Sequence, residues 1–288
     1  MAESKPSTTE RDSWGTDFFG TLNTLPPQPV ALIAEVLEAM RTEPTFQRAR
    51  QELLADLRLA PGATVLDGGC GTGAALPDLL AAAGPTLQVV GVDPTDAFVE
   101  RARARAQQLG AAAARYETGD IRALPFPEAS FDAAFCDKVL LHVGPAAAVL
   151  AELVRVTRPG GRIGAVEWCP MFVLSTSRPE LAHALNDALR RAVYDFLVSA
   201  NLARHFRASG LAEVQTRVYL AQAASLEEHP FWRAFLIDQL PLFAHAGLLT
   251  EEQAQELAAD LQALSGQGVF RASCVVATAV GTKPAASH

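Results

Sequence analysis

Three aspartates stand where apolar segments of the chain end, a placement that suits a ligand rich in hydrogen-bond donors. They are Asp67, Asp93 and Asp120. If the apolar segments form parallel strands, the three carboxylates meet at the carboxyl edge of one sheet, where open α/β sheets bind their ligands. Carboxylates at such an edge would accept hydrogen bonds from hydroxyl, amino or ammonium groups.

A glycine cluster follows the first of these aspartates and opens a helical segment. Gly69, Gly71 and Gly73 lack a Cβ atom, so the backbone can turn sharply and a ligand can approach it closely. The spacing of Gly69, Gly71 and Ala74 also satisfies the dinucleotide-binding fingerprint, in which a pyrophosphate lies at the helix N-terminus. A dinucleotide would use Asp93 for its ribose hydroxyls but offers no obvious partner for the other two carboxylates.

S-adenosylmethionine would use all three carboxylates. Its positively charged amino acid end suits Asp67, its ribose hydroxyls can donate to Asp93, and its adenine amino group can donate to Asp120. It carries no phosphate, so a carboxylate beside the glycine turn meets no like charge. The residues therefore favour a sulfonium nucleoside, with a nicotinamide-dependent oxidoreductase as the alternative.

Four segments, in this order, resemble the motifs of class I S-adenosylmethionine-dependent methyltransferases. They are Val65 to Gly73, Gly91 to Pro94, Asp120 to Phe126 with Ser130 to Asp132, and Arg158 to Arg162. The chain is most similar to the group of ubiquinone, menaquinone and natural-product methyltransferases, over about residues 60–170. The resemblance implies an α/β, Rossmann-like fold with a mostly parallel seven-stranded sheet, helices on both faces and a helical cap.

The resemblance also implies S-adenosylmethionine as the cofactor and a set of positions that bind it. These positions are Asp67, Gly69, Cys70, Gly71, Asp93, Pro94, Asp120, Ile121 and Lys138. Gly69 and Gly71 would contact the amino acid portion, while Ile121 and Pro94 would flank the adenine ring. Each aspartate also has a structural alternative, since Asp commonly caps a turn, starts a helix or closes a loop.

Methyl transfer needs an in-line nucleophile and a site without water, so positioning and desolvation can supply most of the acceleration. A general base is needed only if the acceptor must lose a proton. His142, after the fourth expected strand, is the candidate base because an unperturbed pKa near 6.5 suits this task. A purely structural histidine is the alternative, and Asp137 with Lys138 could form no more than an exposed ion pair.

Aromatic and histidine side chains outside the motifs are candidates for binding the acceptor. They are Trp14 and Phe18 near the N-terminus, Trp168 at a strand end, and His183 and Tyr194 on a later helix. For each, packing or solvent exposure is the alternative. We expect a small, largely apolar acceptor in secondary metabolism, methylated on oxygen, nitrogen or carbon. A cyclase or a non-catalytic binder with the same fold is a further alternative.

Short apolar runs alternate with amphipathic helical patterns from Ala63 onward, which predicts a parallel sheet covered on both faces. The expected strands are Thr64 to Asp67, Leu87 to Asp93, Ala113 to Thr118, Phe131 to Asp137 and Gly161 to Trp168. Helices are expected at about 74–83, 95–109 and 146–156.

Longer helical patterns follow this alternating region, and we interpret them as a cap over the carboxyl edge. They cover about 178–198, 201–209, 226–246 and 250–264, with strands expected at about 213–220 and from Phe270 to Val280. We divide the chain into an N-terminal helical lid segment (1–58), a cofactor-binding core (59–170) and a helical cap with the last two strands (171–288). All three belong to one continuous catalytic domain.

Composition narrows the classes of partner. The 288 residues carry a formal net charge of -8, which disfavours a nucleic-acid acceptor. The four cysteines include no C-x-x-C pair, so we expect no metal site and no disulfide framework. No apolar run approaches the roughly 18 residues of a membrane span, and a cytoplasmic location is expected. Nothing in the pattern specifies an oligomeric state.

Overall fold

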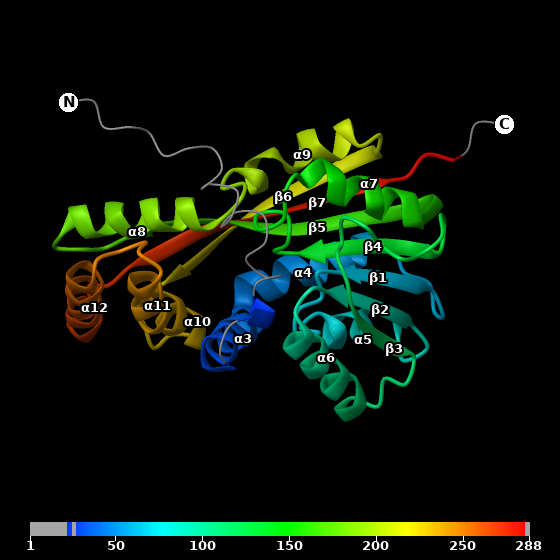
Figure 1. The fold of residues 1–288 in the computed structure, drawn as a ribbon. Coiled ribbons are helices and arrows are strands. Elements are labelled where there is room, and N and C mark those ends of the chain that lie inside the picture. The colour runs from blue at the N-terminus through cyan, green and yellow to red at the C-terminus, as the bar shows by residue number, and fades with distance from the viewer. Residues whose placement is uncertain (1–21, 25–26, 286–288) are drawn as a thin grey trace.

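A seven-stranded sheet forms the centre of the molecule, in a computed structural model that describes residues 22–24 and 27–285. The strand order is β3-β2-β1-β4-β5-β7-β6 (Figure 1). The bounds are Thr64–Gly68 for β1, Gln88–Asp93 for β2, Ala114–Thr118 for β3, Phe131–Asp137 for β4, Thr157–Leu174 for β5, Ala212–Ala223 for β6 and Ala272–Thr282 for β7. Neighbouring strands from β3 to β5 run parallel, and β7 is antiparallel to β5 and β6.

Helices cover both faces of this sheet. The helices α7 (Ala146–Val156) and α9 (Val198–Ala208) lie on one face, and α4 (Pro44–Asp56), α5 (Leu76–Ala83) and α6 (Asp96–Gln108) on the other (Figure 1). The central strands β1 and β4 are buried along almost their whole length, as expected of strands covered on both sides. The predicted mostly parallel seven-stranded sheet with a helix layer on each face is confirmed.

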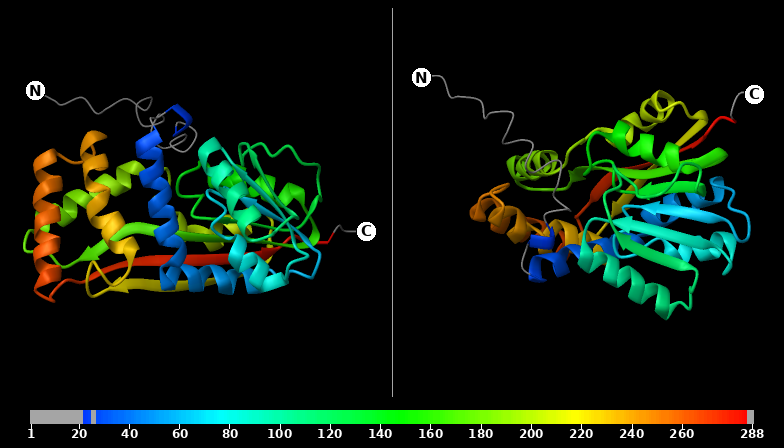
Figure 2. Two further views of the ribbon diagram at one scale, coloured as in Figure 1. Left: turned by 90° about the horizontal axis from the view of Figure 1, so that it is seen from below. Right: turned by 45° about the vertical axis from the view of Figure 1, so that its right-hand side comes forward.

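The strands β5, β7 and β6 extend beyond the other four, and further helices stand over this extension. Figure 2 shows α3, α11 and α12 side by side there. The elements are α3 (Pro27–Thr42), α8 (Pro179–Ala192), α10 (Pro230–Arg233), the π-helical η2 (Ala234–Asp238), α11 (Leu240–His245) and α12 (Glu251–Gly266), with a short η1 (Leu22–Thr24) before α3. No helix among the described residues is long and apolar enough to cross a membrane.

Three expected boundaries were wrong. The helix expected over about 178–198 ends at Ala192, because the backbone N–H groups of Tyr194 and Asp195 donate to Leu141 O and draw the chain away. The stretch expected as one helix over about 226–246 starts at Pro230 and is divided by η2. The strand expected to end at Trp168 continues through Pro170 to Leu174. Proline has no backbone N–H to donate, but Pro170 lies where the β5–β7 register shifts, so no regular interstrand hydrogen bond is needed from it.

Candidate active site

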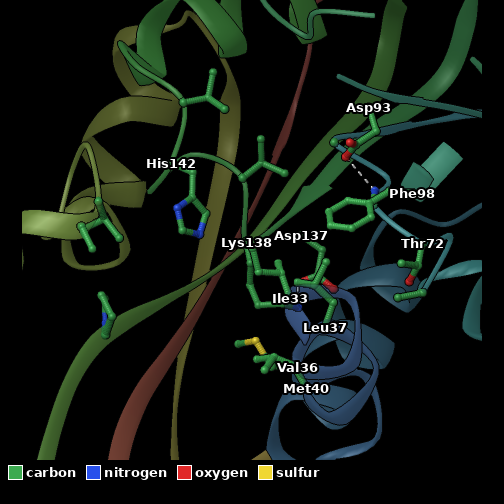
Figure 3. Close-up of a pocket in the computed structure, with 18 of the residues that line it drawn as sticks. Ile33, Val36, Leu37, Met40, Thr72, Asp93, Phe98, Asp137, Lys138 and His142 are labelled. Carbon is green, nitrogen blue, oxygen red and sulfur yellow. Dashed lines mark hydrogen bonds and ion pairs between the residues drawn. The ribbon is translucent and has the colours of Figure 1, made fainter. Parts of the chain in front are cut away.

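A cavity of about 630 Å³ opens at the carboxyl ends of the parallel strands. The loops after β1, β2, β3 and β4, with Trp168 and Pro170 of β5, line one part of it, and side chains from α3, α8, η2 and α11 line most of the rest. Figure 3 shows Asp93 and Phe98 on one side of this space and His142 on the other, with Asp137 and Lys138 between them. The chain thus brings the ends of four strands and the middle of β5 to one cavity.

The glycine turn after β1 forms the floor of one part of the cavity. Gly69 has φ 71° and Gly71 has φ 51°, a conformation that side chains rarely adopt. A Cβ on Gly69 would lie 2.3 Å from Val139 Cγ2, so packing also demands glycine there. A Cβ on Gly71 would find only Leu37 Cδ1 at 3.8 Å, which leaves its backbone open to a ligand.

Asp67 lies beneath this turn with 2% of its surface exposed, and it lines the cavity. Burial, together with the nearby Asp137 and Asp93, raises the pKa of Asp67 to about 8. Its Oδ2 is buried and accepts no hydrogen bond from any described residue. A cationic group in the cavity would satisfy this oxygen and favour the ionised carboxylate.

Asp93 shapes the loop that follows β2 while keeping acceptor capacity for a ligand. Its Oδ2 accepts a hydrogen bond from Gly71 N and its Oδ1 from Thr95 N, both at 2.9 Å. Burial raises the pKa of Asp93 to about 6 despite these bonds. Each oxygen retains a lone pair, so ribose hydroxyls could still donate to it. The helix N-cap is Thr95, which leaves Asp93 in a loop role and removes the helix-cap alternative.

Asp120 lines the cavity after β3 but is much more exposed, at 44% of its side chain. Burial alone would raise the pKa of this carboxyl, but hydrogen bonds from the Arg122 backbone and guanidinium outweigh it and lower the pKa. The bond from Arg122 N, at 2.8 Å, closes the loop as the structural alternative predicted. Neighbouring Ile121 packs against Gly68, where a Cβ would lie 2.5 Å from Ile121 Cδ1.

A buried ionic network supports the end of β4. Arg50, with no exposed surface, donates from Nε to Asp78 Oδ2 at 2.7 Å and from Nη1 to Asp137 Oδ2 at 3.2 Å. Asp137 Oδ1 pairs with Lys138 Nζ, and Lys138 and Arg50 lower the pKa of Asp137 against the effect of burial. The side chains of Asp137 and Lys138 are only 11% and 10% exposed, so an exposed ion pair was the wrong interpretation.

His142 projects into the cavity from the turn after β4, and Glu167 holds this turn in place. Glu167 has no exposed surface, and its Oε1 accepts from Val139 N at 2.9 Å and Leu140 N at 2.7 Å. Burial lowers the pKa of His142 to about 4, so the unperturbed value near 6.5 assumed from the sequence was wrong. The imidazole is therefore neutral throughout the physiological range.

The helix α3 closes the cavity from the N-terminal side. Its residues Ile33, Val36, Leu37 and Met40 line the cavity. On the same helix, Glu38 accepts from Thr72 Oγ1 at 2.7 Å and forms ion pairs with Arg41 and Arg105. Thr72 lies in the glycine turn, so α3 is fastened directly to the loop that would hold a cofactor.

A family model described as a methyltransferase domain matches residues 65–161. The demethylmenaquinone methyltransferase of Beutenbergia cavernae is 36% identical over 158 residues, which cover 51% of this chain and 62% of the relative. An uncharacterized protein of Mycobacterium tuberculosis is 32% identical over 206 residues, which cover 68% of this chain and 72% of that protein. The chain belongs to the class I S-adenosylmethionine-dependent methyltransferases.

The solved structures agree on the fold of this methyltransferase. The YcgJ protein of Bacillus subtilis superimposes with a TM-score of 0.57 and 21% identity, covering 83% of this chain and 99% of that one. The alignments with three of the curated relatives span only 47%, 62% and 38% of their lengths. S-adenosylmethionine is the cofactor of the family, and the partnerless Asp67 oxygen and the open Gly71 backbone fit it.

The residues predicted to bind the acceptor lie in different parts of the structure. Trp168 lines the cavity, packing edge-to-face against Phe235 at 5.1 Å between ring centroids. His183 is exposed on α8, whose buried face is formed by other residues, and it is not among the residues that line the cavity. Tyr194 is 42% exposed and is also not among the cavity-lining residues. Trp14 and Phe18 lie outside the described residues.

Sequence reasoning missed much of the cavity wall of the methyltransferase. The missed residues come from α3, η2 and α11, among them Met40, Phe235, Gln239, Leu242 and Phe243. Their apolar periodicity predicted helices, but nothing local showed which helix face meets the sheet edge. Cys70, Pro94 and Lys138, in contrast, line the cavity as the motifs suggested. Within the described ranges, no cluster of His, Cys, Asp and Glu is arranged to hold a metal ion.

Proposed function

We propose that this methyltransferase moves the methyl group of S-adenosylmethionine to a small, largely apolar acceptor of secondary metabolism. The observation that carries the proposal is the continuity of one cavity. It runs from the buried carboxylates at the ends of β1 and β2 to an apolar wall built by α3, η2 and α11. A cofactor at the first end and an acceptor at the second would meet near Lys138 and His142.

The cofactor end offers a partner for each polar part of S-adenosylmethionine. Asp67 would face the cationic amino acid portion beside Gly69, Cys70 and Gly71. Asp93 would hold the ribose hydroxyls, and the exposed Asp120 would accept from the adenine amino group. Ile121 and Pro94 would flank the ring, and Lys138 would stand at the boundary with the acceptor end. The buried, partnerless Asp67 Oδ2 supports this orientation most directly.

The acceptor end favours an aromatic or polyketide-like molecule. Its wall combines Trp168 with Phe235 and Phe243, whose rings would stack on or around a planar apolar ligand. The name of the Beutenbergia relative includes demethylmenaquinone as the acceptor, an apolar aromatic compound, which supports the same class here. A net charge of -8 makes a nucleic acid an unsuitable acceptor.

The protein's own contribution is positioning and the exclusion of water. When bound, the cofactor supplies a methyl group on a positively charged sulfur, which leaves as a neutral thioether. The Glu167 carboxyl fixes the turn from Val139 to His142, and α3 closes over the cavity through Glu38. Fixing two reactants in a dry site can contribute about 7–11 kcal/mol to the barrier reduction. On this basis α3 acts as the lid of the catalytic domain.

His142 is the proposed proton acceptor when the acceptor group is a hydroxyl. With a pKa of about 4 it is neutral, so it can accept a hydrogen bond, but it is too weak a base to ionise a hydroxyl in advance. It would orient the hydroxyl and take its proton only as the new bond to carbon forms. The rate should consequently show no ionisation of His142 between about pH 6 and pH 9.

Calorimetry with S-adenosylhomocysteine and with NAD tests the cofactor end, and we expect micromolar affinity for the first ligand only. Mass spectrometry of an acceptor panel of phenols and hydroquinones then tests transfer through the gain of a methyl group. His142→Ala should lower kcat about 10- to 100-fold while leaving S-adenosylhomocysteine affinity unchanged. The surface variant His183→Ala is the matched control. An unchanged kcat for His142→Ala at saturating acceptor removes this residue from the mechanism.

A further inference from the structure

Of the residues between 235 and 246 that line the cavity, only Gln239 and the exposed His245 are polar. Phe235, Gln239, Leu242, Phe243 and Ala246 all line the cavity, and their spacing places them on a single helical face. Gln239 therefore points in the same direction as four apolar side chains. Helical periodicity alone would have predicted an apolar residue at this position.

Gln239 is buried, with 7% of its surface exposed. Its backbone is satisfied, because its N–H donates to Ala234 O and its carbonyl accepts from Phe243 N, both at 3.1 Å. Its side-chain amide makes no hydrogen bond with any described residue. Because Gln239 lines the cavity, its amide nitrogen and oxygen can bond water or a ligand there.

The surroundings define the kind of partner that the amide could have. Among the cavity-lining residues from α8 through Leu248, the other polar side chain is His245, and that residue is exposed. The charged side chains elsewhere in the cavity wall include Arg41, which pairs with Glu38 at 3.1 Å, and Lys138, which pairs with Asp137. Because these charges are already paired, a carboxylate or ammonium group of a ligand beside Gln239 would compete with an existing ion pair for its counter-ion. An uncharged oxygen needs only the donor and acceptor that one glutamine amide supplies.

We infer that Gln239 hydrogen-bonds an uncharged oxygen of the acceptor, a carbonyl or hydroxyl carried on its apolar skeleton. The inference rests on the proposed function and makes its acceptor more specific: an aromatic or polyketide-like molecule with a neutral oxygen group at the Gln239 end. Gln239 is then a specificity residue, since a site built around a buried amide rejects the hydrocarbon analogue that leaves it unpaired.

Matched ligands test the hydrogen bond directly. The probes are 1-tetralone and tetralin, which differ at one carbonyl, and their dissociation constants are measured by tryptophan fluorescence with saturating S-adenosylhomocysteine. The preference for the ketone over the hydrocarbon should fall about 5- to 10-fold in Gln239→Leu, the value of one hydrogen bond. The exposed Gln262→Leu on α12 should keep the wild-type preference. An equal preference in wild type and Gln239→Leu overturns the inference.

Thermal unfolding of the ligand-free protein gives an independent answer, even if the two probes bind too weakly to compare. Gln239→Leu removes an unpaired polar group from an apolar wall, so its Tm should equal or exceed that of wild type, by up to roughly 4 °C. A Tm that falls further than that of Gln262→Leu shows that the amide is bonded within the protein, and this result also overturns the inference.

The affinity for S-adenosylhomocysteine separates this inference from the proposed function. It should be the same in wild type and Gln239→Leu, because Gln239 lies at the other end of the cavity from Asp93. If wild type binds no S-adenosylhomocysteine, the proposed function fails. The Tm comparison and the probe preference without that ligand still decide the role of Gln239.

Discussion

At its cofactor end the cavity presents carboxylates fixed at strand ends, whereas its acceptor end is closed by apolar side chains from α3, η2 and α11. Asp93 is held by two backbone N–H groups, and its orientation follows from the strand that precedes it. Phe235 and Met40 are held only by packing against their neighbours. The cofactor end therefore depends on the direction of hydrogen bonds, and the acceptor end on shape and the exclusion of water.

The largest effect is expected when hydrogen-bond acceptors are removed from the cofactor end. Asp93→Ala combined with Asp120→Ala removes two charged acceptors from the cofactor end, each worth about 1.5–3 kcal/mol. The affinity for S-adenosylhomocysteine should fall by about 100-fold or more, as measured by calorimetry. Asp93→Ala alone should cause most of this loss, because Asp93 is buried while Asp120 is already paired with Arg122.

Glu117→Gln, an exposed change on neighbouring β3, is the control for this experiment and should bind as wild type does. If the double variant still binds S-adenosylhomocysteine at full strength, the carboxylates do not form the site. The distinction between a polar and an apolar end would then have no functional meaning.

The cofactor end could be predicted from the sequence because its geometry is local. The segment from Val65 to Gly73 contains a strand, a tight turn and a helix start, and the observed β1 differs from the expected strand by one residue. Strand ends in a parallel sheet necessarily meet at one edge, so Asp67 and Asp93 could be placed together without any tertiary information. The unusual electrostatics of Asp67 could not be predicted, because burial depends on distant residues.

The burial of Asp67 predicts a second effect, a change in how stability depends on pH. The folded pKa of Asp67, about 8, lies above its usual value, so its contribution to stability is present at low pH and is lost as pH rises toward 8. Asp67→Asn carries no such proton. From pH 5 to pH 7, the free energy of unfolding of ligand-free wild type should therefore fall by about 3 kcal/mol relative to Asp67→Asn. Urea unfolding at pH 5, 6 and 7 measures this difference.

Parallel curves for the two proteins would show that Asp67 ionises normally, and the argument for a cationic partner at its Oδ2 would weaken accordingly. Saturating S-adenosylhomocysteine sharpens the test. A cationic group beside Asp67 should stabilise the ionised form, so the ligand should reduce the pH dependence of wild type and leave that of Asp67→Asn unchanged.

The acceptor end could not be predicted from the sequence, because its residues lie far apart in the chain. Nothing near Met40 or Phe235 indicates that the two share a cavity. His183 was a candidate because it is polar on an apolar helix, but the buried face of α8 leaves it outside. Gln239 is likewise a polar residue in an apolar helical segment, but it does line the cavity. Only the tertiary structure shows that Gln239 faces the cavity and His183 does not.

A smaller effect, confined to one end, is expected from Phe235→Leu. The ring of Phe235 packs against Trp168 at 5.1 Å and Phe172 at 5.3 Å, and leucine preserves apolar volume while removing the aromatic contacts. The affinity for 1-tetralone should fall roughly 3- to 10-fold, with S-adenosylhomocysteine affinity unchanged. The counterpart Phe98→Leu at the cofactor end should show the reverse pattern. Loss of both affinities in either variant would mean that the two ends are not separable.

The smallest expected effect concerns the point where the two ends are joined. Glu38 lies on α3, in the apolar wall, yet accepts from Thr72 in the glycine turn and pairs with Arg105. Because these contacts are partly exposed, Glu38→Gln should cost only about 0.5–1 kcal/mol. If α3 is a lid over both ligands, this cost appears as a 2- to 5-fold loss of affinity for S-adenosylhomocysteine and 1-tetralone alike. The exposed Glu35→Gln on the same helix should change neither. A loss confined to one ligand would show that α3 belongs to that end alone, and that the cavity closes in two independent parts.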